Sequence, residues 1–172
     1  MRLTLSSFER LTLVNQYRIL AAVSTSDREY YTRLADNLEA GHTWLYRDFP
    51  HLQEELSDST CRHVLDILQL YELLQASYRD LADKDGIAER EVAFDGFDGN
   101  NESEMLSFAQ ALIEDHRYVD VLGETAVNSH GRTTEVYERM LAGWRAMGEP
   151  HDLLSASQIK QILAERIHPV HR

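Results

Sequence analysis

The chain has 172 residues, of which 43% are hydrophobic, and a formal net charge of −12. This length and composition suit one domain with a full hydrophobic core. Direct nucleic-acid binding is disfavoured, because 17 basic residues face 29 acidic ones and no basic run offers a surface for phosphates. The single cysteine, Cys61, and the lack of a secretory signal pattern or membrane-spanning run predict a cytoplasmic protein that does not enter a membrane.

Two N-terminal helices are predicted by helix-start signals and by apolar residues at helical spacing. The first is expected from Ser6 to about Val23, and the second follows Ser26. Each of these serines stands three positions before a glutamate, so a reciprocal capping box can satisfy two backbone N–H groups at the helix start. The second helix should end at Gly41, because glycine adopts the left-handed conformation of a helix end at little cost.

An aromatic connector follows within an irregular segment near 42–57. It carries Trp44, Tyr46 and Phe49, which together present more apolar surface than a short connector can hide. We therefore expect the chain to form a homo-oligomer.

The longest helix is expected over 58–83 and is apolar on most of its circumference. Its polar residues form a narrow stripe of Arg62, Asp66, Gln69 and Asp80. Because such a helix belongs in the middle of a bundle, we predict an all-α fold, with a single domain over 1–172 and about six helices around this central helix. Cys61, on the apolar side, is interpreted as a small buried hydrophobic residue rather than a reactive thiolate.

The second half of the chain predicts three more helices separated by loops. The irregular segment near 84–100 holds an expected turn of helix over 87–92, and Phe94 and Phe97 should anchor its turn-rich end to the core. A second irregular segment lies near 120–132. The helices are expected at about 102–118 behind an Asn101 capping box, from Thr133 or Thr134 to Gly148, and from a Ser155 capping box towards a frayed tail at 168–172.

No motif for catalysis or cofactor binding occurs in the sequence. It contains no phosphate-binding loop, no G-x-G-x-x-G, no G-x-S-x-G and no H-E-x-x-H. The loop with Asp95 and Asp98 lacks the glycine and the final glutamate of a calcium-binding loop, so it is interpreted as a turn. We therefore predict no catalytic residues, no metal site and no cofactor.

Five polar residues are candidates for ligand binding. Asn15 interrupts an apolar helix beside Tyr17, and its amide can bond either a ligand or a neighbouring loop. Arg62 and Asp66 can line a pocket, with a solvent-exposed stripe as the alternative. Asp98, in the turn-rich loop, is the fifth candidate. The sequence leaves a structural interpretation open beside the functional one at these positions.

Short fragments in order along nearly the whole chain form a larger pattern. They are Arg10–Tyr17, Arg33-Leu34, Glu39–Gly41, Thr60–Arg62, Asp66-Ile67, Tyr71, Phe94–Asp98, Met140-Leu141 with Trp144, and Leu154–Ala156 ahead of Ile159 and Ile162. Together they resemble the YfbU family of small bacterial proteins. The resemblance implies an all-helical fold without assigned catalytic residues. Because the family's domain is also found joined to helix-turn-helix regions, it further implies ligand sensing or regulation rather than catalysis.

The residues and the resemblance together favour a non-enzymatic, cytoplasmic domain that binds a small ligand or a protein partner in a regulatory or stress-related role. Two alternatives stay open. The first is a divalent-metal-dependent hydrolase in which Asp66, Asp95 and Asp98 hold the ion, because hard cations favour carboxylate oxygens. The second is a purely structural oligomeric adaptor.

Overall fold

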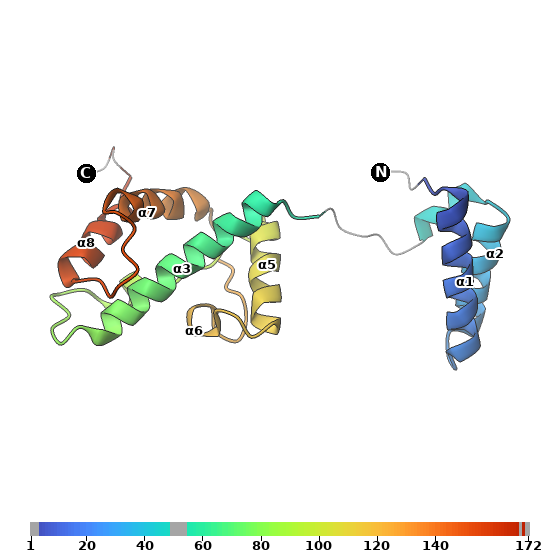
Figure 1. Ribbon diagram of the computed structural model, residues 1–172, viewed down its shortest axis with the longest axis horizontal. Coiled ribbons are helices and arrows are strands. Elements are labelled where there is room, and N and C mark those ends of the chain that lie inside the picture. Colours follow the sequence, from blue (N-terminus) through green and yellow to red (C-terminus); the bar gives the residue numbers. More distant parts are fainter. Residues whose placement is uncertain (1–3, 49–54, 169, 171–172) are drawn as a thin grey trace. The chain divides into compact units, whose positions relative to one another are not determined.

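The computed structural model describes residues 4–48, 55–168 and 170. These residues form eight α-helices and one 3₁₀ helix, and the only strand-like pairing among them is an isolated bridge between Phe97 and Asn128. The predicted all-α fold is confirmed. Contacts between Cα atoms divide the chain into two compact units, Met1–Glu54 and Glu55–Arg172 (Figure 1), each of which we describe by itself. That the whole chain is a single domain stays a prediction.

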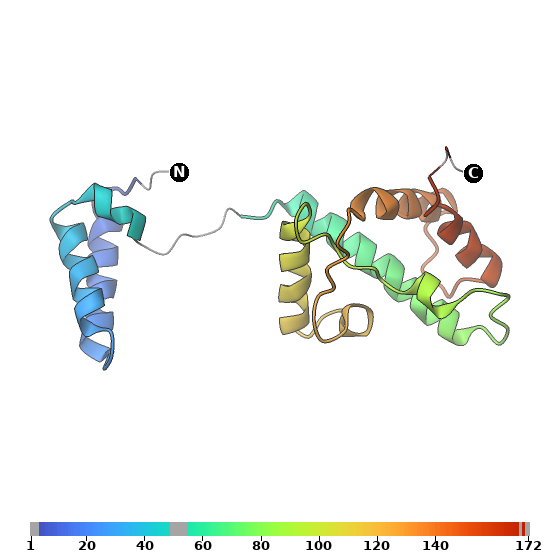
Figure 2. The same ribbon diagram turned by 180° about the vertical axis from the view of Figure 1, so that it is seen from behind.

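The first unit is a helical hairpin. Helix α1 (Ser7–Val23) packs along α2 (Arg28–Glu39), and the 3₁₀ helix η1 (Thr43–Asp48) follows, as Figure 2 also shows. Four buried residues form its core: Val14, Leu34, Leu38 and Tyr46. Arg18 joins the two helices through ion pairs with Asp36 at 3.1 Å and Glu39 at 2.6 Å.

The ends of these helices follow local signals in part. The capping box of Ser6 and Glu9 is confirmed. The one expected at Ser26 is wrong, because α2 begins after Asp27 and the Ser26 hydroxyl donates to the Asp27 carboxylate at 2.6 Å. The predicted end at Gly41 is confirmed, with φ of +72° at that glycine.

The aromatic connector is only partly exposed. Tyr46 is 2% exposed and fills the core of the first unit, so it adds no surface for an oligomer. Trp44 is 62% exposed, as expected. Phe49 lies outside the described residues.

The second unit is built around α3 (Asp58–Asp80). It contacts every other helix of the unit, namely α4 (Glu89–Val92), α5 (Ser103–Glu114), α6 (Val119–Leu122), α7 (Thr134–Ala146) and α8 (Ala156–Ala164) (Figure 1). Its fully buried residues include Ile67, Leu68, Leu70, Tyr71 and Leu74. The predicted central helix is confirmed within this unit. It ends three residues earlier than expected, because Leu81 leaves the helical region with ψ of 123°.

The end of α5 differs from the prediction. The helix stops at Glu114 rather than near 118, because His116 takes a left-handed conformation with φ of +57°. The N–H groups of His116 and Arg117 then donate to the carbonyls of Ile113 and Leu112, at 2.9 and 2.8 Å. This is the arrangement that usually has glycine at its left-handed position. Helix α6 lies in the segment expected to be irregular.

The predictions for the remaining helix ends of the second unit are partly confirmed and partly wrong. The capping box of Ser155 and Gln158 and the end of α7 at Gly148 are confirmed. The Asn101 capping box is wrong, since Glu102 is the N-cap of α5 and makes no cap bond there. Within the frayed tail expected at 168–172, residues 169, 171 and 172 lie outside the described part of the chain. None of the described helices combines the length and apolar character needed to cross a membrane.

Candidate functional site

The turn-rich loop over 94–102 docks on the segment that precedes α7. The Phe97 N–H donates to the Val127 carbonyl at 3.2 Å, and the Ser129 N–H donates to the Phe97 carbonyl at 3.1 Å. At Gly96, with φ of +90°, a Cβ atom would lie 2.0 Å from the Val127 oxygen. Only glycine fits there. Phe97 is fully buried and Phe94 is 8% exposed, so the predicted anchoring of this loop is confirmed.

Glu102 holds this junction together from the inside. Its carboxylate accepts from the N–H groups of Asp98 (2.9 Å), Thr133 (2.9 Å) and Thr134 (2.8 Å), and from the Thr134 hydroxyl at 2.6 Å. It therefore caps α7 in place of the Thr133 side chain, which makes no cap bond. Burial raises the pKa of Glu102, but these bonds outweigh burial and lower it to about 2. The carboxylate stays charged at the positive end of the α7 dipole.

Asp98 is buried in the same loop and bonds within it. It is 2% exposed. Its carboxylate accepts from the Asn101 side chain and, at 3.0 Å, from the Asn100 N–H. These two hydrogen bonds lower the pKa of Asp98. The loop is thus a turn closed by local Asp and Asn bonds, as the sequence indicated.

The other acidic candidates pair with arginines far along the chain. Asp66 accepts from Arg145 at 2.6 Å, across from α3 to α7. Asp95 pairs with Arg166, which also donates to the Glu91 carbonyl at 3.0 Å. Within the described ranges, no group of three or more His, Cys, Asp or Glu side chains is arranged to hold a metal ion.

A groove lies beside the C-terminal half of α3 in the second unit. Its volume is about 290 Å³. It is lined by Gln69, Glu72, Leu73 and Ala76 from α3, Trp144 from α7, and His151 and Leu153. The Trp144 indole N–H donates to the Pro150 carbonyl at 3.0 Å, and His151 meets the indole edge-on at 6.0 Å. These contacts hold the segment after α7 in place as one wall of the groove.

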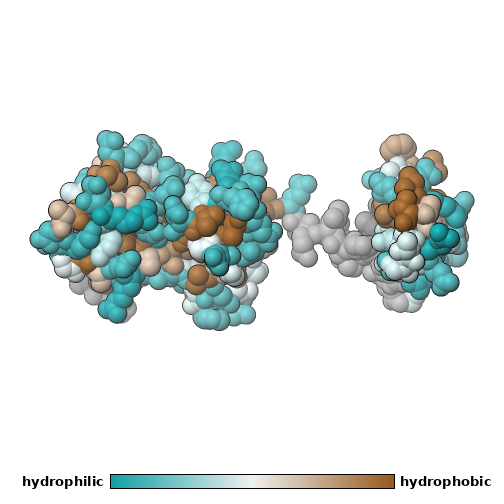
Figure 3. All heavy atoms as spheres, turned by 90° about the horizontal axis from the view of Figure 1, so that it is seen from below, coloured by the Kyte–Doolittle hydropathy of each residue, from teal (hydrophilic) through white to brown (hydrophobic). Residues whose placement is uncertain are grey.

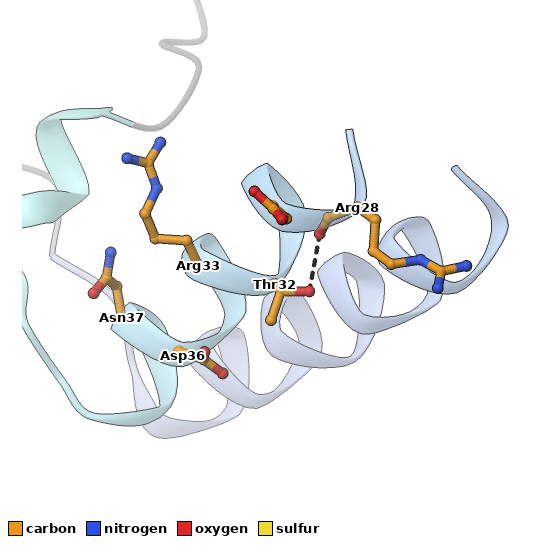
Figure 4. Close-up of a pocket in the computed structure, with 6 residues that line it drawn as sticks. Arg28, Thr32, Arg33, Asp36 and Asn37 are labelled. Carbon is orange, nitrogen blue, oxygen red and sulfur yellow. Dashed lines mark hydrogen bonds between the residues drawn. The ribbon is translucent and has the colours of Figure 1, made fainter. Parts of the chain in front are cut away.

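A second hollow runs along the polar face of α2 in the first unit. It has a volume of about 460 Å³ and is lined by Arg28, Glu29, Thr32, Arg33, Asp36 and Asn37. In Figure 4 the Arg28 and Arg33 side chains extend away from each other rather than into a shared centre. All six lining residues belong to one helix. The hollow is therefore an open helix face, and its polar groups do not converge on a ligand.

The first unit also exposes an apolar surface on α1. The exposed fractions are 79% for Phe8, 59% for Leu11, 63% for Ile19 and 70% for Val23. Figure 3 shows apolar residues, in brown, on the surface of this unit. Isolated exposed apolar residues are ordinary, but four on one helix form a patch that a partner can cover.

Comparison with known families shows to which family the chain belongs. The family model of the YfbU domain matches residues 1–164. The chain belongs to the YfbU family. This YfbU match covers all the described helices of both units, so the family resemblance read from the sequence is confirmed.

The predicted ligand residues of this YfbU chain are divided between the two units. Asn15 and Tyr17 lie in the first unit, where Asn15 is exposed and Tyr17 stacks on Tyr31 with ring centroids 6.2 Å apart. In the second unit Arg62 is exposed on α3, beside the half-buried Cys61. None of the hollows above is lined by any of the five candidates. Their part in ligand binding stays a prediction.

Sequence reasoning missed the residues that matter most in this geometry. The sequence indicates Glu102 only as the start of a helix, and Trp144 as part of the family resemblance. The groove combines residues more than sixty positions apart, so no local spacing could have indicated it.

Proposed function

We propose that this YfbU-family chain is a non-enzymatic binding protein of the bacterial cytoplasm, which works as a homo-oligomer in a regulatory role. The groove beside Trp144 supports the binding function most directly. The carboxylates that could have served chemistry are engaged instead, since Asp66 and Asp95 pair with arginines and Asp98 bonds its own loop.

The groove favours a small amphipathic ligand. Its walls at Leu73, Ala76 and Leu153 are apolar, whereas Gln69 and Glu72 are exposed polar residues. Small-molecule sites start at roughly 300 Å³ and combine apolar walls with a few polar groups. A ligand with an apolar ring or chain and one amino group would match the walls and pair with Glu72. The net charge of −12 adds a long-range attraction for such a cation.

The ligand class can be tested with small primary amines that carry one ring or short chain. Trp44→Phe is the working background, because Trp144 is then the only fluorophore of its type. We expect the amines to raise the melting temperature and change Trp144 emission, since a ligand of the folded form alone stabilises it. Glu72→Gln should abolish both effects, and Glu124→Gln, at an exposed position outside the groove, should retain them.

Two results would contradict the groove as the binding site. One is an unchanged melt and emission with every amine, which would favour the structural adaptor if the protein is nonetheless oligomeric. The other is an equal response in Glu72→Gln and in the background protein.

A further inference from the structure

We propose that α1 is the surface through which two copies of this chain associate, in an antiparallel pair with its two-fold axis at Asn15. The inference rests on the homo-oligomer of the proposed function and names its interface. It starts from the face of α1 that α2 leaves open.

Four exposed apolar residues of α1 form a single stripe together with Asn15. At about 100° per residue, Phe8, Leu11, Asn15, Ile19 and Val23 fall within about 120° of the helix circumference. The buried residues Val14 and Ala21 lie on the side that packs against α2. Helix α1 therefore has two apolar faces, and the hairpin covers one of them. Asn15 lies near the middle of the open face, and the exposed Thr12 falls within the same arc.

The stripe is nearly symmetric about Asn15. In an antiparallel pair centred there, residue number i faces residue 30 − i of the second copy. Leu11 then faces Ile19, Phe8 faces the small and exposed Ala22, and Asn15 faces its own copy. A two-fold interface requires self-complementarity of this kind. The two amides can hydrogen-bond each other, and one such polar pair in an apolar seam selects register and orientation.

The parallel arrangement is less favourable. It would put Phe8 against Phe8 and bring Arg18 near the Arg18 of the second copy. The antiparallel pair places Arg18 opposite Thr12, so like charges are kept apart. The alternation of large and small side chains also packs better than two matched bulky layers.

The exposed area agrees with an interface of ordinary size. Phe8, Leu11, Ile19 and Val23 are between 59% and 79% exposed. At roughly 100 Å² of apolar surface each, they offer roughly 400 Å² per copy. A standard interface buries about 800 Å² per partner, of which somewhat more than half is apolar. The stripe thus supplies most of the apolar share.

Disulfide trapping in the whole 172-residue chain tests the arrangement. All variants carry Cys61→Ser, which removes the one native thiol. Asn15→Cys should form a covalent dimer under mild oxidation. Leu11→Cys alone should not, because the two copies of residue 11 would stand about 12 Å apart along the axis, beyond disulfide reach. A mixture of Leu11→Cys and Ile19→Cys should again form a dimer.

Light scattering of matched variants separates this inference from the proposed function. Ile19→Asp should raise the dimer dissociation constant about a hundredfold, because it buries an unpaired charge at the interface of both copies. Ile19 is 63% exposed, so the fold itself should tolerate the change. Ile167→Asp, at a residue that is 53% exposed in the second unit and outside the groove, should leave the mass unchanged.

Three outcomes would overturn the inference. Self-trapping of Leu11→Cys would indicate a parallel pair. A dimer that Asn15→Cys does not trap would place the interface elsewhere and leave the homo-oligomer of the proposed function intact. If the protein is monomeric and the thiol of Ile19→Cys resists alkylation, the stripe is covered by a contact within one chain. That result would also refute the homo-oligomer of the proposed function.

Discussion

Replacement of Glu102 by glutamine tests how far the second unit depends on one buried carboxylate. Three backbone N–H groups and two hydroxyls donate to it, from Asp98, Thr133 and Thr134. Glutamine keeps one acceptor oxygen, and its NH₂ group must then face the Asp98 N–H. An unsatisfied buried donor costs about 1–3 kcal/mol, and the lost charge at the start of α7 about 0.5–1 kcal/mol more. We expect Glu102→Gln to lower the free energy of unfolding by about 3 kcal/mol at neutral pH.

The pH dependence follows from the same carboxylate. Because its pKa is lowered from 4.5 to about 2 in the folded state, its contribution is present above pH 4.5 and is lost as the pH falls towards 2. The full shift corresponds to about 3 kcal/mol, which solvent screening reduces to about 2 kcal/mol. The stability difference between the wild type and Glu102→Gln should therefore shrink through this window.

Urea unfolding followed by far-UV circular dichroism measures this difference at each pH. Glu124→Gln is the matched control, because Glu124 is exposed, and it should unfold like the wild type at neutral pH. A loss below about 0.5 kcal/mol in Glu102→Gln would refute the capping role. So would a difference that stays constant as the pH falls from 4.5 towards 2, the window set by the two pKa values.

Three further substitutions have defined outcomes. Gly96→Ala should lower the melting temperature by roughly 10 °C or more, because its Cβ would meet the Val127 carbonyl; an unchanged melt would contradict the close approach. Asn15→Leu should lower the dimer dissociation constant but allow both helix orientations, so that Leu11→Cys in this background forms a disulfide with its own copy. If Leu11→Cys still forms no such disulfide, the amide pair does not select the orientation. Arg145→Ala should cost less than about 1 kcal/mol in urea unfolding, since Arg145 and its partner Asp66 are both partly exposed; a loss above about 2 kcal/mol would mean that the pair is structural.

The parts of the fold that local signals determine could be predicted from the sequence. The capping boxes at Ser6 and Ser155 and the glycine ends at Gly41 and Gly148 involve residues within one helical turn of each other. The central place of α3 follows from its apolar circumference. These features depend little on what lies elsewhere in the chain.

The parts that failed depend on partners distant in sequence. Helix α7 starts at Thr134 behind Thr133 as predicted, but its cap is the carboxylate of Glu102, 31 residues earlier, which no spacing rule at Thr133 could reveal. The end of α5 uses His116 in a conformation that usually signals glycine. On α1, the sequence indicated a broad apolar face without showing which part α2 would cover. The partner of Asp66 is equally distant, since it pairs with Arg145, 79 positions away.

The mass of the 172-residue chain in solution tests the central claim most directly. That claim is that the chain is a binding protein and that the open face of α1 joins two copies. Multi-angle light scattering at micromolar concentration should give twice the 19.8 kDa of one chain, and the single-chain mass for Ile19→Asp. A single-chain mass for the unaltered protein would contradict the account, and so would a dimer that Ile19→Asp leaves intact.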